Sequence, residues 1–170
     1  MLKENAVTLC LRMLVGEGAG SGMAVMFLCI YNMLIKEVIA FENAPENTVS
    51  FALVLEDKDA YPVTGGFAWI HWLAANITRN ELENNESQTA RDFIQGCNSW
   101  TSIQGNQQSK ELSCYYGGMT PPDKEHIYEL HIFALDKLLD LENGFLLNEL
   151  YREMDGHILD SFILKGIYMN

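Results

Sequence analysis

Positive charge is scarce in this sequence. Its 170 residues include 11 lysines and arginines against 23 aspartates and glutamates, so the formal net charge is −12 at pH 7. No cluster of basic side chains occurs anywhere along the chain. Nucleic-acid binding requires a basic face that displaces counterions from phosphates, and an anionic membrane surface repels an acidic protein. The composition therefore argues against both kinds of partner.

Long apolar runs are also missing. The segment 24–35 is apolar, but it is shorter than the roughly 20 residues that a membrane helix needs. The segment 6–15 is interrupted by Arg12 and is not followed by a clear signal-peptidase site. We therefore predict a cytoplasmic protein without stable membrane insertion.

Cysteine and proline are few, with 4 of each. The low proline content and the 48% of hydrophobic residues indicate a globular protein, most simply of one domain. The cysteines form no C-x-x-C pair, which excludes a zinc ribbon or a thioredoxin-like motif. Cys97 and Cys114 flank a polar loop, so a disulfide between them stays open, although reduced thiols are the usual state in a cytosolic protein.

The most informative stretch is 50–77. The apolar run 51–55 is followed by acidic residues, a Pro/Gly-rich connection and a second apolar run that contains His71. Two such runs joined by a turn-rich connection predict adjacent β-strands. Asp57, at the end of the first strand, is then expected to approach His71 in the second. A carboxylate beside an imidazole raises the pKa of that imidazole and fixes its tautomer.

The segment 125–135 has the alternating hydrophobicity of a β-strand. This alternation places His126 and Tyr128 on one face, about 7 Å apart along the strand, and His131 on the other face. We therefore expect His126 and Tyr128 to share a site from which His131 is excluded.

The rest of the chain is predicted to be mostly β-strand and loop. Helical spacing at 146–154 predicts a short helix late in the chain, and 157–168 predicts a last strand. The polar segment 78–114 predicts loops with at most a short surface helix. The methionine-rich segment 23–41 fits either a helix or a buried strand.

Six short motifs follow one another between residues 56 and 159. They are EDKDA at 56–60, WIHWL at 69–73, YGGMTPP at 116–122, EHIY at 125–128, FALD at 133–136 and MDGHIL at 154–159. In this order they resemble the motifs DPDAP, W-x-H-W-L, YGGPCPP, EHRY, YALD and M-x-G-H-V-L of the phosphatidylethanolamine-binding protein family. The bacterial, Raf-kinase-inhibitor-like branch is the most similar. The resemblance extends from Ile39 to Tyr168.

The resemblance implies a mainly β fold, namely an antiparallel β-sandwich with Greek-key connections and one or two short C-terminal helices. It divides the chain into an atypical N-terminal segment, 1–38, and a family-like domain, 39–170, with the segment expected to be part of the same domain. The sequence departs from the family where Met119 and Thr120 replace Pro-Cys and where Ile127 replaces an arginine.

The resemblance also implies one small ligand-binding pocket. Two imidazoles and a phenol donate hydrogen bonds to an oxyanion, and a glycine-rich corner lets backbone N–H groups approach a ligand. Asp57 is expected to hold the tautomer of His71. The predicted ligand-binding residues are Asp57, His71, Gly118, Thr120, Pro121, His126 and Tyr128.

We therefore predict a protein that binds a small anion and is not an enzyme. The anion is a phosphate, a phospholipid head group or a carboxylate, and no cofactor or resident metal is predicted. Through this ligand the protein is expected to regulate a partner protein such as a kinase. Bacterial relatives suggest a homodimer.

Three alternatives remain at this point. The protein inhibits a protease or a kinase through its surface alone, or Asp57, His71 and His126 form a two-histidine, one-carboxylate metal site. The third alternative is a hydrolase-like activity in which an Asp–His pair is the general base. The sequence has no G-x-S-x-G elbow, and Cys114 is the only candidate thiol beside the glycine-rich loop 117–122, which we call the glycine loop.

Overall fold

The computed structural model describes residues 24–27, 39–83 and 85–169, and these residues form a mainly β protein. Its strands are β1 (Ala24–Phe27), β2 (Ile39–Glu42), β3 (Ser50–Asp57), β4 (Trp69–Ile77), β5 (Glu81–Leu82), β6 (Ile94–Gly96), β7 (His126–Leu135) and β8 (Ile158–Tyr168). Its helices are short: α1 (Tyr61–Thr64), α2 (Glu86–Thr89), the 3₁₀ helix η1 (Ser99–Thr101), α3 (Lys110–Ser113) and α4 (Leu147–Met154). None of the helices in the described ranges is both long and apolar enough to cross a membrane.

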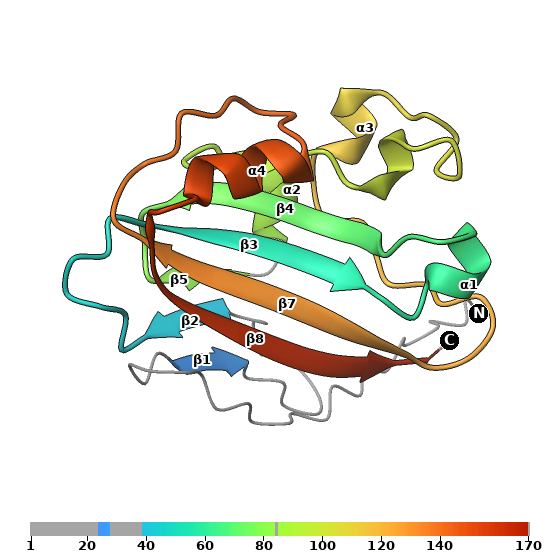
Figure 1. Cartoon of the computed structure of the whole chain (residues 1–170), viewed down its shortest axis with the longest axis horizontal. Helices are drawn as coiled ribbons and strands as arrows, with labels where there is room; N and C mark the ends of the chain where they lie inside the picture. The colour runs from blue at the N-terminus through green and yellow to red at the C-terminus, as the bar shows by residue number, and fades with distance from the viewer. Residues whose placement is uncertain (1–23, 28–38, 84, 170) are drawn as a thin grey trace, which may run out of the picture.

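The strands form two antiparallel sheets. The larger sheet has the order β6-β4-β3-β7-β8, and the smaller sheet has the order β1-β2-β5. Figure 1 shows α4 lying on one side of the larger sheet and β2 and β5 on the other. The prediction of antiparallel sheets with a short helix late in the chain is thus confirmed.

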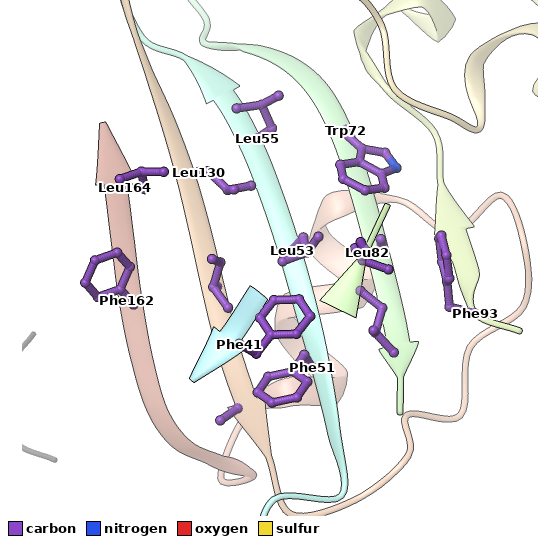
Figure 2. Close-up of a cluster of buried hydrophobic side chains, with 14 of the residues drawn as sticks. Phe41, Phe51, Leu53, Leu55, Trp72, Leu82, Phe93, Leu130, Phe162 and Leu164 are labelled. Carbon is purple, nitrogen blue, oxygen red and sulfur yellow. The ribbon is translucent and has the colours of Figure 1, made fainter. Parts of the chain in front are cut away.

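The central strand β3 is buried on both faces, which explains why it reads as a continuous apolar run. Phe51, Leu53 and Leu55 point toward the smaller sheet and pack in one hydrophobic cluster with Phe41 of β2 (Figure 2). Ala52 and Val54 point the other way and belong to a second cluster, which contains Leu150 and Met154 of α4. Because successive side chains of a strand point to opposite faces, the residues of β3 fall into these two separate clusters.

Residues 78–114 are largely loops and turns, as predicted, but they contain more short elements than the one surface helix expected. These elements are the strands β5 and β6 and the short helices α2, η1 and α3. The strand β6 pairs with Leu73–Ala75 at one edge of the larger sheet. Only three residues of β6 are paired, so no alternation was long enough to be recognised.

The structure also shows the conformation of two other segments that the sequence analysis discussed. Of 23–41, the described residues 24–27 and 39–41 lie in strands, while 23 and 28–38 lie outside the described residues. The Pro/Gly connection after β3 begins with the helical turn α1, with proline in its first turn. Gly65 ends this turn at φ +79°, a left-handed conformation that glycine adopts without steric cost.

We predict that the contact between the two sheets is a major source of stability. Phe41 is 4% exposed, and its ring stacks on Phe51 with centroids 4.3 Å apart. The substitution Phe41→Ala should lower the free energy of unfolding by about 3–5 kcal/mol, because it removes a buried ring and leaves a cavity. The control Leu138→Ala, at an exposed side chain, should change it by less than about 0.5 kcal/mol. Urea denaturation of both variants measures this, and equal effects would contradict the prediction.

Candidate functional site

Four polar side chains gather where β3 ends and β4 and β7 begin, and we call them the polar cluster: Asp57, His71, His126 and Tyr128. Antiparallel pairing brings these strand ends together, since Asp57 is directly opposite Trp69 on β4 and Tyr128 on β7. All four are almost fully buried, with exposures of 3%, 5%, 0% and 2%. The rings of His71 and Tyr128 meet edge to face at 5.2 Å.

The carboxylate of Asp57 holds His126, not His71 as the sequence suggested. His126 Nδ1 donates to Asp57 Oδ2 over 2.7 Å, and the backbone N–H of Ala60 donates to Asp57 Oδ1 over 3.2 Å. Asp57 is the last residue of the central strand, with β7 on one side and β4 on the other. Strand spacing alone did not decide between the two histidines.

His71 is oriented by the glycine loop instead. Its Nδ1 lies 2.8 Å from the carbonyl oxygen of Gly117, and the backbone N–H of Gly117 donates to the carbonyl oxygen of His71 over 2.8 Å. A carbonyl only accepts, so Nδ1 carries the proton. Burial lowers the pKa of His71, and this outweighs the opposite effects of the Gly117 and Gly118 carbonyls and of Asp57. The imidazole is therefore neutral, with Nε2 as an acceptor.

His126 lies between two carboxylates. Besides Nδ1 bonded to Asp57, its Nε2 lies 2.8 Å from Asp123 Oδ1. Two carboxylate partners require that both ring nitrogens donate, which only the imidazolium does. Burial alone lowers the pKa of His126, but the hydrogen bonds and charges of Asp57 and Asp123 outweigh it, so the pKa is raised. His126 is thus the positive charge of the polar cluster.

Asp123 was not expected from the sequence. Its side chain is 41% exposed, and its hydrogen bond to His126 lowers the pKa of its carboxyl. The available signal was a carboxylate three residues before a histidine, in the loop that leads into β7. That spacing predicts contact only where the chain folds back locally, and the bend at 122–124 was visible only in the structure.

Tyr128 has a buried hydroxyl that makes no hydrogen bond of good geometry with any of the described residues. Burial raises the pKa of this phenol, and the nearby Asp57 charge raises it further. The hydroxyl is therefore protonated. An unsatisfied buried hydroxyl costs free energy, so it marks a place where a ligand oxygen or a water would be stabilised.

The predicted loop residues differ in their surroundings. Pro121 is buried, whereas Gly118 and Thr120 are exposed. A side chain at Gly118 would meet no atom within 4 Å, but a Cβ at Gly117 would lie 3.2 Å from Asn98 Nδ2. Gly117, which bonds His71, is therefore the more tightly packed of the two glycines in this loop.

The proposed metal ligands do not form a compact set. Among the described residues, the one group of three whose donor atoms lie within 4.8 Å of one another is Glu56, Glu129 and His131. This group lies on the other face of the sheet, as the alternation predicted for His131. Lys58 and Lys165 pair with Glu129 at 2.5 and 2.8 Å and hold its pKa at about 2, despite the opposing effect of burial. The group is a charge-balanced ion-pair network.

Comparison with known proteins gives a consistent result. The family model "Phosphatidylethanolamine-binding protein" matches residues 35–169. The uncharacterized protein YxkA of Bacillus subtilis is 44% identical over 131 residues, which cover 75% of this chain and 77% of that protein. A UPF0098 protein of the archaeon Methanothermobacter thermautotrophicus is 32% identical over 136 residues, covering 79% and 82% of the two chains.

Solved structures agree with this result. The crystal structure of the phosphatidylethanolamine-binding protein homolog CT736 from Chlamydia trachomatis superposes with a TM-score of 0.64 at 29% identity, over 79% of this chain and 80% of that one. Escherichia coli YbcL, described as a member of the mammalian PEBP family, gives a TM-score of 0.62 over 79% of each chain. At 22% identity it supports the fold alone.

We predict that the two histidines of the polar cluster titrate in opposite directions from the ordinary value near 6.5. In ¹⁵N-resolved NMR spectra, His126 should keep both ring protons above pH 6.5, while His71 should stay neutral below it. The stability that His126 contributes is fully present below pH 6.5 and is lost as pH rises through its raised folded pKa. His71 has the opposite effect on stability, because its pKa is lowered in the folded protein. As pH falls, the unfolded chain takes up the His71 proton before the folded chain does, and stability is lost.

The matched variants are Asp57→Asn, which should lower the pKa of His126, and Asp140→Asn, an exposed site with the same charge change, which should not. A His126 that loses its proton at a lower pH than His71 would contradict this assignment.

Proposed function

The chain belongs to the phosphatidylethanolamine-binding protein family, and we propose that its polar cluster binds a small anion carrying a phosphate or a carboxylate. The observation that carries this proposal is the buried Tyr128 hydroxyl, which lies beside the imidazolium of His126 and has no hydrogen-bonding partner of good geometry among the described residues. A neutral donor next to a fixed positive charge is suited to an anionic oxygen.

Each group has a distinct role in this proposal. Tyr128 donates its hydroxyl proton to one oxygen of the ligand. His126 supplies the positive charge, and Asp57 keeps it protonated and oriented. His71 cannot donate through Nδ1, which is bonded to Gly117, so its Nε2 accepts a hydrogen bond from a protonated ligand oxygen. This role differs from the expectation that both imidazoles donate, and it favours a singly protonated phosphate.

Asp123 supports the same chemistry from within the chain. An oxygen of its carboxylate accepts the hydrogen bond from His126 Nε2, and the proposed ligand would offer the same kind of oxygen to this nitrogen. Because Asp123 is partly exposed and sits in a loop, a ligand that also bonds Tyr128 has an advantage over it. The side chain then acts as an internal competitor for the ligand position.

The affinity is expected to be weak. Asp57 balances the charge of His126, and the chain as a whole carries −12. Screening over about 8 Å at physiological salt confines most of the unfavourable field to near neighbours. Binding therefore depends on local hydrogen bonds, with dissociation constants on the order of millimolar for inorganic phosphate.

The structure offers little support for the hydrolase alternative. Burial and the neighbouring Cys97 raise the pKa of the Cys114 thiol to about 12, so Cys114 is protonated at neutral pH and is a poor nucleophile. The predicted protein partner and homodimer concern the outer surface and stay predictions. Affinity capture and light scattering of the purified chain would test them.

We predict that removing one hydroxyl weakens anion binding. In an NMR titration with inorganic phosphate, phosphoethanolamine and acetate, Tyr128→Phe should raise the dissociation constant about ten- to a hundredfold. A hydrogen bond to a charged group is worth about 1.5–3 kcal/mol, and about 1.4 kcal/mol corresponds to a factor of ten. The control Tyr151→Phe, at a tyrosine that packs on Phe133, should leave binding unchanged.

Saturable shifts of the His71 and His126 signals establish binding at the polar cluster. Absence of shifts at tens of millimolar ligand, or equal affinity of the wild-type and Tyr128→Phe proteins, would refute the proposal.

A second prediction concerns the internal competitor. Asp123→Ala frees His126 Nε2 and should lower the dissociation constant for phosphate about two- to fivefold, because a partly exposed ion pair contributes little free energy. The control Asp140→Ala removes the same charge at an exposed position. If both substitutions strengthen binding equally, overall charge and not the contact with His126 is responsible.

A further inference from the structure

The two described cysteines lie side by side in the fold, although they are 17 positions apart in the sequence. The Sγ atoms of Cys97 and Cys114 are 3.2 Å apart. Cys97 follows strand β6 and is buried, whereas Cys114 follows helix α3 and is partly exposed. We propose that this pair is an oxidative modification site, at which a disulfide forms within the folded protein.

The surrounding backbone already holds the two segments together. The residue after Cys97, Asn98, donates its N–H to the carbonyl oxygen of Ser113, the residue before Cys114, over 2.9 Å. The amide of the Asn98 side chain also donates to the carbonyl oxygen of Tyr115 over 2.9 Å. Asn98 and Ser113 are 2% and 0% exposed. The sulfurs need to approach by only about 1.2 Å to reach the bonded distance.

The oxidant is a low-molecular-weight disulfide, RSSR. The partly exposed Cys114 thiolate attacks one sulfur of RSSR, which forms a mixed disulfide and expels the first RS⁻. The Cys97 thiolate then attacks Cys114 Sγ, which forms the protein disulfide and expels the second RS⁻. The two cysteine protons are taken up by the two RS⁻ groups. Two protein thiols are oxidised, and RSSR is reduced to two RSH.

The environment makes this reaction slow near neutral pH. Burial and Cys97 raise the pKa of Cys114, while the Lys110 ammonium and the Ser113 hydroxyl act in the opposite direction and are weaker. The thiolate is the attacking species, so mildly alkaline conditions accelerate the reaction. The pair therefore resists brief exposure to an oxidant and responds to a sustained one.

The bond would fix the start of the segment that leads to the polar cluster. Gly117, three residues after Cys114, exchanges two hydrogen bonds with His71. A covalent link at Cys114 shortens the part of this segment that can open independently. Hydrogen exchange of the Gly117 amide should therefore slow in the oxidised protein.

The test uses the full chain with Cys10→Ser and Cys29→Ser, so that Cys97 and Cys114 are the only thiols. The folded protein is incubated with oxidised glutathione at about pH 8.5, quenched with acid, alkylated and digested with trypsin. Cleavage after Arg91, Lys110 and Lys124 separates the two cysteines. We expect peptides 92–110 and 111–124 to be recovered as one disulfide-linked species with two hydrogen atoms fewer.

Thermal unfolding gives the second measurement. Closing a loop of this length should raise the melting temperature by about 6–12 °C, reversibly with a reductant. In the same background Cys114→Ser, at the partly exposed position, should form no link and show no shift. Recovery of alkylated thiols or of glutathione adducts in place of the link would overturn the proposal. A linked protein that melts at a lower temperature would also overturn it, because the native backbone would then not accommodate the bond.

Discussion

The hydrogen bond from the buried imidazolium of His126 to the buried carboxylate of Asp57 is the interaction on which the rest of the site depends. It joins the end of the central strand β3 to the start of β7. The other oxygen of Asp57 accepts from Ala60 and so sets the turn that follows the strand. Removing one partner of a buried charge pair leaves the other uncompensated, which costs more than the pair itself contributes. The pair therefore fixes the local backbone as well as the charge of His126.

The polar cluster lies directly beside the hydrophobic core. Tyr128 belongs to the same buried cluster as Phe51 and Trp72, and His71 packs edge to face on it. This position removes water from both histidines, but with opposite results. His71, bonded only to carbonyl groups, becomes neutral, whereas His126, bonded to two carboxylates, keeps its proton. The polar cluster thus holds one neutral imidazole, His71, and one imidazolium, His126. Their hydrogen-bonding partners account for this difference.

Asp123 adds a further carboxylate to the polar cluster. The segment between the glycine loop and β7 places a carboxylate on the nitrogen that a ligand would use. In our proposal, an anion displaces this side chain only if it offers a further bond, for example to Tyr128. A monodentate ion gains little from the exchange. Under this proposal the internal contact favours ligands with at least two oxygens at the correct separation.

The sequence by itself determined the faces of the strands and the family. Alternation in 125–135 placed His126 and Tyr128 together and His131 on the opposite face, and the six motifs identified the family over most of the chain. These features are local, because side chains alternate along any strand whatever its partners are. The same local signal failed in 78–114, where the paired segments are only two or three residues long.

Only the tertiary structure decided which groups bond. Asp57 and His126 are 69 positions apart, and Cys97 and Cys114 are 17 apart. The register between strands and the course of the loops set these contacts, and neither is encoded in the periodicity of one segment. For this reason the sequence assigned Asp57 to His71, overlooked Asp123 and left the cysteine pair open.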